Sequence, residues 1–373
     1  MKIKSIYFFY IVTFIFRLFF ATQVGLADDE AYHWSWAKEL QLSYFDHPGF
    51  IAWCEALSTA LFGDTFFGVR LPAMIFYGLT AFWSWKLTKD LFNEQAAHWV
   101  VLIFLWSPFY GFGGHVASPE PPFIFFWILS SWIFWQGVRE DEHRWSLSKT
   151  WIYLGLSMGL GINSKFIISL LAPGFALFML FHPKHRKDFL TPWPWLGAGV
   201  ATLMSLPVFY WNYIHDWPSF KYQFHDRHTH TAFSFLRWLE FLGAQLIFYS
   251  PFLYVLILFI FIYSYFKKSQ SRWLFIFALS APSFFVFYPQ PFTAEFKPHW
   301  TGAAVLILIM GVAGALNLGI IRYRRFWNLS IALFYVLFSF ITYAPFIYPW
   351  LPKAYRLISS EPWSPRNDLS NEF

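Results

Sequence analysis

Side chains that could do chemistry stand in short groups along this sequence. The first group is Asp28-Asp29-Glu30, whose three neighbouring carboxylates repel one another, so one is expected to hold a proton or a nearby cation. The group could supply a general base or a cation site facing a cavity. It could instead be the acidic first turn of the following helix, which the helix dipole favours. Both hold if Asp28 caps that helix while Asp29 or Glu30 is catalytic.

The next two groups join an acid to a bend or a helix start. Asp46-His47 precedes Pro48-Gly49, a bend that could aim the imidazole at a phosphate or a proton, or be only a turn. Glu120 begins a long apolar stretch, where a carboxylate is costly and functional by default. The two prolines that follow it suit the first turn of a helix, and an acid there also meets a favourable dipole.

Basic and imidazole groups complete the set. Lys165 could bind a phosphate, neutralise Glu120 or extend to the membrane interface. The segment 211–230 could be a polar interfacial loop, could bind phosphate through Arg227 and imidazoles, or could chelate a divalent metal ion. Its candidate residues are His215, Asp216, His225, Arg227, His228 and His230, with His225, His228 and His230 as the metal ligands. Glu295, Lys297 and His299 form a last group, and no other cofactor is expected.

The elements that position these groups must lie in a membrane. Hydrophobic residues make up 57% of the chain and charged residues only 13%, about half the charge of a soluble domain. Aromatic residues reach 25%, and Trp and Tyr suit membrane interfaces. The net charge of +6 is dispersed over short loops, which fits membrane topology better than nucleic-acid binding. A single cysteine, Cys54, excludes an intramolecular disulfide.

Apolar windows predict an all-α polytopic membrane protein with about eleven transmembrane helices. The windows are 5–22, 66–85, 95–112, 121–138, 150–163, 166–181, 194–214, 241–266, 273–289, 299–319 and 327–346. The fifth and sixth are short and could form a tight hairpin, and the first is expected to be a retained helix, not a cleaved signal peptide. Two outer loops are long, 23–65 and 215–240, and the first should hold juxtamembrane amphipathic helices at 31–42 and 50–62. Residues 1–346 would form one unit and 347–373 a short outer tail.

The basic residues orient the chain. With the N-terminus in the cytoplasm, 16 of the 27 Lys and Arg residues fall in short cytoplasmic segments, as the positive-inside rule requires. They are Lys2, Lys4, Lys86, Lys89, Arg139, Arg144, Lys149, Lys184, Arg186, Lys187, Lys267, Lys268, Arg272, Arg322, Arg324 and Arg325. About 15 of the 21 acids then lie outside. Because the rule gives acids little weight, their position suggests one outward-facing active cavity.

Several stretches, in order, resemble the GT-C superfamily of membrane glycosyltransferases. They are Asp29-Glu30-Ala31-Tyr32-His33-Trp34-Ser35-Trp36, Tyr44-Phe45-Asp46-His47-Pro48, Phe62-Gly63-Asp64 with Gly68-Val69-Arg70-Leu71-Pro72, Ser118-Pro119-Glu120-Pro121-Pro122, Ser164-Lys165, and Trp211-Asn212 with His215-Asp216-Trp217 and Phe220. The similarity runs to about residue 310. The nearest resemblance is to the bacterial branch with the lipid A aminoarabinose transferase and relatives of the dolichyl-phosphate-mannose protein mannosyltransferases.

The resemblance implies an inverting enzyme that moves a sugar from a polyprenyl-phosphate donor, outside the bacterial inner membrane, to lipid A or another envelope glycolipid. It places catalysis at Asp29, with Glu30 beside it and Glu120 as the second acid. Glu120 replaces the commoner Asp, and residues 296–300 depart from the Glu-Ala-Asn-Trp pattern of many relatives. We assign substrate binding to Asp46, His47, Lys165, His215, Asp216, His225, Arg227, His228 and Lys297.

Rival functions have distinct signatures. A protein O-mannosyltransferase would share the donor chemistry but act on protein. A transporter or flippase of lipid-linked sugars would also place charge within the membrane, but the sequence has no inverted repeat or pair of broken helices. A non-catalytic assembly protein would transfer no sugar.

Overall fold

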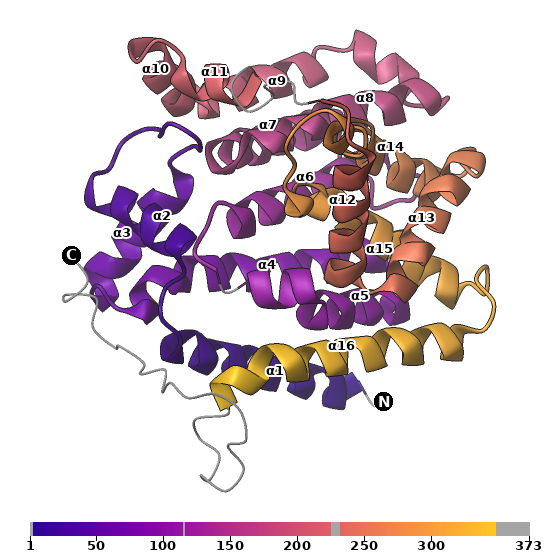
Figure 1. Cartoon of the computed structure of the whole chain (residues 1–373). Helices are drawn as coiled ribbons and strands as arrows, with labels where there is room; N and C mark the ends of the chain where they lie inside the picture. The colour runs from indigo at the N-terminus through magenta and orange to yellow at the C-terminus, as the bar shows by residue number, and fades with distance from the viewer. Residues whose placement is uncertain (1–2, 115, 225–231, 348–373) are drawn as a thin grey trace, which may run out of the picture.

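The computed structural model describes residues 3–114, 116–224 and 232–347 as helices joined by short loops (Figure 1). The α-helices are α1 (Ile3–Gln23), α2 (Asp28–Lys38), α3 (Phe50–Phe62), α4 (Phe66–Leu91), α5 (Glu94–Trp106), α6 (Glu120–Val138), α7 (Leu147–Ser164), α8 (Leu171–Phe181), α9 (Trp193–Met204), α10 (Leu206–Ile214), α11 (Pro218–Phe224), α12 (Phe235–Tyr249), α13 (Pro251–Phe266), α14 (Ser271–Phe287), α15 (Gly302–Asn317) and α16 (Arg324–Ile347). Shorter π or 3-10 turns are η1 (Pro108–Phe112), η2 (Phe166–Leu170), η3 (Arg186–Leu190), η5 (Gln290–Phe292) and η6 (Pro298–Thr301). No strand occurs in these ranges, so the predicted all-α class is confirmed.

Each predicted window falls on a helix or a run of helices. Within the described residues, three segments could cross a membrane alone by length and composition: Phe66–Leu91, Ser271–Phe292 and Pro298–Asn317. Two bent pairs, α1 with α2 and α12 with α13, meet the same criterion jointly. The figure of about eleven spans therefore stays a prediction.

The window 241–266 is not one straight helix. Helices α12 and α13 meet at 107°, and Ser250 between them has a φ of 68°. The Ser250 hydroxyl accepts a hydrogen bond from the Leu253 amide, and Pro251 occupies the first turn of α13. Ser followed by Pro is a signal for a helix start, and it is visible in the sequence.

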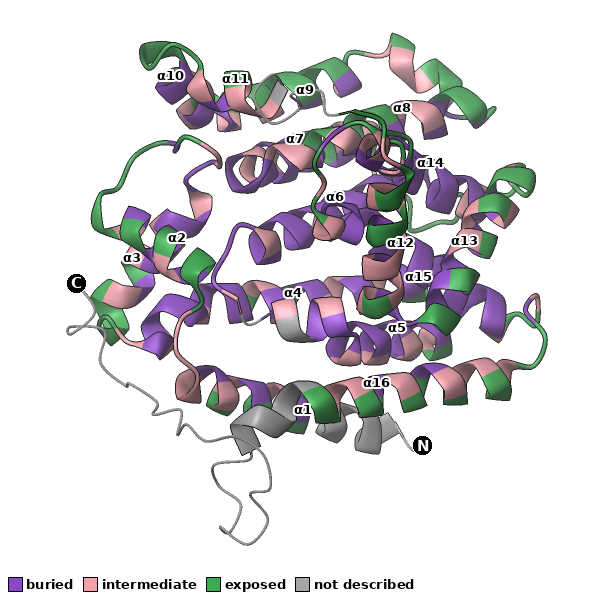
Figure 2. Ribbon diagram, in the orientation of Figure 1, coloured by how far each residue is buried: buried purple, intermediate pink, exposed green. Residues whose placement is uncertain are grey.

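Helix α15 forms the centre of the bundle. Its residues from Gly302 to Leu316 are all buried, and it packs against α5, α6, α13 and α14 (Figure 2). The helix carries no charged residue, and a Cβ on Gly311 would lie 2.7 Å from Ile260, so this glycine permits close packing. The η6 turn leads directly into α15, which therefore gives the residues just before it a fixed support.

Small residues bring α7 and α9 together. A Cβ on Gly155 would lie 2.3 Å from the Gly197 carbonyl oxygen, and a Cβ on Gly197 would lie 2.6 Å from that of Trp151. Backbones approach this closely where glycine repeats on facing helices of a membrane protein. The windows 150–163 and 166–181, which correspond to α7 and α8, were expected to pack together as a tight hairpin. This prediction is wrong, because α7 packs chiefly on α9 and α6, while α8 packs on α14.

The segment 23–65, predicted to be an outer loop, holds two helices where juxtamembrane helices were expected. Helix α3 has the predicted bounds, while α2 begins at Asp28, three residues earlier than expected, and so includes all three acids in its first turn. Both helices lie to one side of the stacked bundle, at the left of Figure 1. The favourable dipole expected for these acids is therefore present, but the expected cap is wrong: Ala27 is the N-cap, and Glu30, not Asp28, accepts a hydrogen bond from its amide.

A buried acid on α3 gives a prediction. Burial, followed by the charge of Glu30, raises the pKa of Glu55 well above its usual value, and neither carboxyl oxygen has a hydrogen-bond partner. The folded protein thus keeps a proton that the unfolded chain releases near pH 4.5, and stability falls as pH rises above that value. We expect Glu55→Gln to raise the melting temperature in detergent, with a larger gain at pH 8 than at pH 5. An equal change at both pH values would contradict this, and exposed Glu39→Gln is the control.

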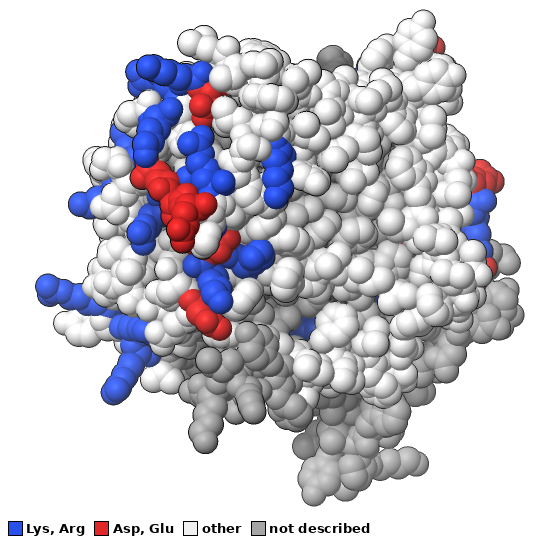
Figure 3. Space-filling view, turned by 180° about the vertical axis from the view of Figure 1, so that it is seen from behind, with Lys and Arg blue, Asp and Glu red and all other residues white. Residues whose placement is uncertain are grey.

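Charged side chains gather at one end of the molecule on the face shown in Figure 3. Ion pairs assigned by charge to the cytoplasmic loops include Arg139 with Asp141, at 2.5 Å, and Lys184 with Glu140, at 3.5 Å. The broad remainder of this face shows few charged side chains, most of them at its opposite edge. A band with so few charges suits contact with lipid.

Candidate active site

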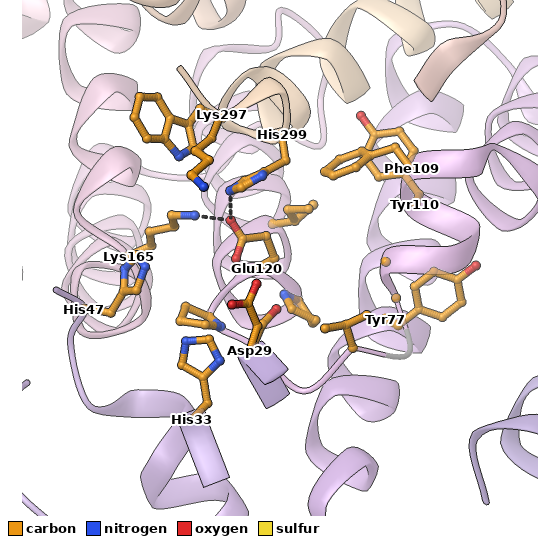
Figure 4. Close-up of a pocket in the computed structure, with 18 of the residues that line it drawn as sticks. Asp29, His33, His47, Tyr77, Phe109, Tyr110, Glu120, Lys165, Lys297 and His299 are labelled. Carbon is orange, nitrogen blue, oxygen red and sulfur yellow. Dashed lines mark hydrogen bonds and ion pairs between the residues drawn. The ribbon is translucent and has the colours of Figure 1, made fainter. Parts of the chain in front are cut away.

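One cavity of about 460 Å³ gathers acids and bases from distant parts of the chain (Figure 4). It lies where α2, the loop after it, α4, η1, the start of α6 and η6 meet. Its polar and charged lining includes Asp29, Tyr32, His33, Asp46, His47, Glu120, Lys165, Tyr222, Lys297 and His299. The two predicted acidic positions therefore face the same space.

Asp29 is the exposed acid of this cavity. It lies in the first turn of α2, and no hydrogen bond or ion pair joins its carboxylate to another described residue. Its neighbour His33, one turn later, is buried, and burial lowers the pKa of the imidazole. His33 is therefore neutral near pH 7, and the Asp29 carboxylate remains open to a substrate.

Glu30 does not line the cavity. It is 2% exposed and forms an ion pair with Arg70, whose Nε and Nη2 donate to the two carboxylate oxygens at 2.7 and 2.5 Å. The amides of Ala27 and Ala117 donate to the same carboxylate, both at 2.9 Å. With four donors, the carboxylate links the start of α2 to α4 and to the loop before α6.

Arg70 uses its remaining donors on the segment that ends α1. Its Nη1 donates to the Ala21 and Val24 carbonyls, both at 2.6 Å, and its Nη2 to Gly25 at 2.8 Å. A planar guanidinium can hold several oxygens at once, which a lysine cannot. The Glu30–Arg70 clamp therefore fixes the turn from which Asp29 projects.

Glu120 is held by two basic groups. Its Oε1 accepts from the Lys165 ammonium and lies 3.2 Å from His299 Nε2. Lys165 is only 3% exposed and pairs with Glu120, so it does not extend to the membrane interface. Glu120 also begins α6, with Pro121 and Pro122 in the first turn as expected. A buried lysine paired in this way keeps the carboxylate at a fixed point of the cavity.

Asp46 and His47 line the cavity from the loop between α2 and α3. Tyr32 donates to Asp46 Oδ1 at 3.2 Å, and burial followed by the Asp46 charge raises the pKa of the tyrosine to about 12. Helix α11 holds this loop in place, because the Gln223 side chain donates a hydrogen bond to the Asp46 carbonyl at 2.8 Å. His47 and Lys165 also border a smaller pocket of about 90 Å³, whose other lining residues are apolar except for two glutamines: Phe166, Ile167, Gln223, Val286, Phe287, Gln290 and Trp300.

The other predicted binding residues are not found in the cavity lining. His215 and Asp216 follow α10 and do not line the cavity; His215 Nδ1 instead lies 2.7 Å from the Trp211 carbonyl oxygen. His225, Arg227, His228 and His230 lie outside the described residues, as does the predicted tail from 348. Among described side chains, no three His, Cys, Asp or Glu residues come close enough to hold a metal ion.

Two residues that hold the candidate acids, Arg70 and His299, were not assigned as site residues from the sequence. Arg70 is a charged residue near the start of a span, a position that signals a buried partner. His299 was noted beside Lys297, but nothing in its spacing pointed to Glu120. Its position depends on η6 folding back against the start of α6, a contact between residues far apart in sequence.

Known proteins share this sequence pattern and fold. The family model described as dolichyl-phosphate-mannose-protein mannosyltransferase matches residues 46–211. The crystal structure of ArnT from Cupriavidus metallidurans bound to undecaprenyl phosphate superimposes with a TM-score of 0.70, at 16% identity, over 95% of this chain and 67% of that one. The predicted resemblance to GT-C membrane glycosyltransferases is confirmed. An oligosaccharyltransferase from Archaeoglobus fulgidus also shares the fold, with a TM-score of 0.57 at 12% identity, over 98% of this chain and 61% of that one.

Curated relatives with similar sequences come from bacteria. Lipid A galacturonosyltransferase RgtD of Rhizobium johnstonii is 24% identical over 82% of this chain and 63% of its own length. An undecaprenyl phosphate-alpha-4-amino-4-deoxy-L-arabinose arabinosyl transferase of Pseudomonas fluorescens is 29% identical over 47% of this chain and 32% of its own. The chain thus spans less than two thirds of these relatives.

Proposed function

We propose that this protein is an inverting glycosyltransferase that moves a sugar from a polyprenyl-phosphate donor to lipid A or another envelope glycolipid. The observation that carries the proposal is the convergence of Asp29 and the Glu120–Lys165 pair on one cavity within the GT-C fold. The names of the relatives supply the two sugars to test first, aminoarabinose and galacturonic acid.

The proposed setting is the bacterial inner membrane, with about eleven spans, a cytoplasmic N-terminus and a periplasmic cavity. The basic residues of the short loops support this orientation, because they are retained on the cytoplasmic side. The charged end seen in Figure 3 is consistent with it. Helices α2 and α3 would then lie at the outer interface and bring Asp29 to the membrane surface.

The donor phosphate is assigned to the junction of the two pockets. His47 and Lys165 border both spaces, and the apolar walls of the smaller one suit the first units of a prenyl chain. Charge-assisted hydrogen bonds from a lysine and an imidazole stabilise the charge that grows on a leaving phosphate. The sugar would then occupy the larger cavity, between this junction and Asp29.

The chemical step needs one base and one leaving group. An acceptor hydroxyl oxygen attacks the anomeric carbon from the face opposite the phosphate, and a new C–O bond forms there. The bond from that carbon to the phosphate oxygen breaks, and its electron pair leaves with the polyprenyl phosphate. Asp29 takes the hydroxyl proton. If the acceptor is a phosphate, it is already anionic, and Asp29 serves to orient it.

Glu30 and Glu120 have supporting roles in this scheme. Glu30 is assigned as a positioning residue, because its carboxylate is filled by Arg70 and two amides. Glu120 faces the cavity and can accept a sugar hydroxyl while it holds Lys165 beside the phosphate. Binding of a metal ion by the histidine-rich loop is tested by the EDTA treatment described below.

Purified protein should transfer labelled sugar from polyprenyl phosphate to lipid A and release one free polyprenyl phosphate per product. The product linkage should have the inverted anomeric configuration by NMR. The double variant Asp29→Asn/Glu120→Gln is the negative control, and EDTA treatment tests the metal ion. Transfer to peptide alone would indicate a protein glycosyltransferase. Movement of intact donor across vesicles without transfer would indicate a flippase.

A further inference from the structure

A second crevice, of about 340 Å³, lies between α7, α8 and α9 and shares no lining residue with the candidate active site. Since α7 packs on α9 while α8 packs on α14, the crevice follows the gap between these two groups of helices. Its floor includes the buried side chains of Leu154, Phe175 and Met179, and its rim is exposed at Ala198. The lining contains no charged side chain, so the crevice suits a hydrocarbon chain.

Arg186 is a cation at one end of this crevice. It begins the 3-10 turn η3, in which side chains three residues apart eclipse one another, so Arg186 lies on the same side of the turn as Phe189, a lining residue. The Arg186 Nε donates to the Leu180 carbonyl at 3.1 Å, and Leu180 follows the lining residue Met179 in α8. The guanidinium is therefore held between η3 and the end of α8, at the mouth of the crevice.

The charge of Arg186 is not neutralised by a neighbouring acid. Asp188, two residues further along the turn, lies 2.8 Å from His185 Nδ1 and 3.7 Å from Arg144 Nη2. Among the described residues, no acid forms an ion pair with Arg186, which is exposed. The next residue, Lys187, adds a second exposed cation. A guanidinium in this state can bind a phosphate with two parallel hydrogen bonds.

Trp195 marks the same end of the crevice. Its indole Nε1 donates to the Phe189 carbonyl at 3.1 Å, and its ring lines the crevice while 68% of the residue stays exposed. A tryptophan with a bound polar edge and an open apolar face is typical of the boundary between lipid head groups and hydrocarbon. A lipid chain in the crevice would thus have its head group close to Arg186.

We infer that this crevice binds a phospholipid of net negative charge, with its phosphate on Arg186 and one acyl chain between α7, α8 and α9. Basic groups beside apolar grooves between membrane helices recognise anionic lipids in this way. A zwitterionic lipid would bring its own cation toward Arg186 and Lys187, so it should bind more weakly. The bound chain would join α8 to the α7–α9 pair and stabilise their packing, whatever reaction the active site performs.

The test measures binding of phosphatidylglycerol and phosphatidylcholine to the purified full chain in detergent, by native mass spectrometry and by melting temperature. Phosphatidylglycerol should bind more tightly and raise the melting temperature more. Arg186→Gln should weaken its binding by about 10- to 100-fold, the range of a charge-assisted hydrogen bond, and change phosphatidylcholine by less than about 2-fold. Arg186→Lys should restore part of the loss. Ala198→Trp should fill the crevice and weaken binding of both lipids.

Two variants are matched controls. Lys267→Gln removes an exposed cation directly after α13, and Leu196→Trp adds an indole to α9 outside the crevice lining. Both should bind lipid as the wild-type protein does. Equal binding of the two lipids by the wild-type protein would overturn the inference. Equal losses in Arg186→Gln and Lys267→Gln would overturn it too, because they would indicate general attraction to a positive surface. Full binding by Ala198→Trp would place the lipid outside the crevice and contradict the inference as well.

Discussion

Asp29→Asn is expected to lower kcat for transfer to a hydroxyl acceptor by about 10²- to 10⁴-fold, with little change in KM for the donor. The amide has the shape of the carboxylate but cannot take a proton. Because Asp29 makes no hydrogen bond or ion pair with a described residue, the fold should be unaffected. Steady-state kinetics and the melting temperature of the same preparation measure the two effects.

The neighbouring acid provides the control for Asp29. Asp28 lies in the same turn of α2, is exposed and does not line the cavity, so Asp28→Asn should keep full activity. Full activity of Asp29→Asn with a hydroxyl acceptor would refute the assignment. A small loss that is confined to a phosphate acceptor would agree with an orienting role, because that acceptor needs no base.

The second large effect is expected at Arg70. Arg70→Met should destabilise the protein by about 3–5 kcal/mol, because it leaves the buried Glu30 carboxylate without its counter-ion. It also removes the donors of three carbonyls that end α1. Since the clamp sets the turn that carries Asp29, the activity that survives should show a reduced kcat. Thermal unfolding in detergent and kinetics at a permissive temperature measure both effects.

Two comparisons make the Arg70 prediction specific. Adding Glu30→Gln to Arg70→Met should recover part of the lost stability, because the second change removes the unpaired charge. Lys38→Met breaks the exposed pair with Asp64, in the same segment 23–65, and should cost at most about 1 kcal/mol. If Arg70→Met costs no more than Lys38→Met, the clamp does not support the site.

Much of the architecture follows from local sequence. Long apolar windows predict helices because a membrane leaves backbone groups no other partners, and each window proved helical. A common site was predicted for several of these groups, and Asp29, Glu120, Asp46, His47, Lys165 and Lys297 all line one cavity. Each follows or begins an apolar stretch, so topology alone brings them to one end of the bundle.

The features that the sequence did not predict share a physical cause. The bend at Ser250 and the separation of α7 from α8 concern directions and partners of helices, and apolar composition does not encode these. Likewise, Glu30 and Asp29 are adjacent acids of the same turn, yet one is clamped and the other open. Their difference depends on Arg70, forty residues away, whose reach cannot be judged before the helices are packed.

The residues that form the cavity are synthesised at different times. The Glu30–Arg70 clamp needs the chain only as far as Ala117, whereas Lys297 and His299 arrive with η6, just before α15. At about 5–20 residues per second, roughly 15–50 s of synthesis separate Asp29 from His299. During that interval the membrane already contains the acidic half of the pocket, without the basic turn that completes it. Under the proposed function, a newly made chain would therefore not act on lipid-linked sugars until η6 has been synthesised.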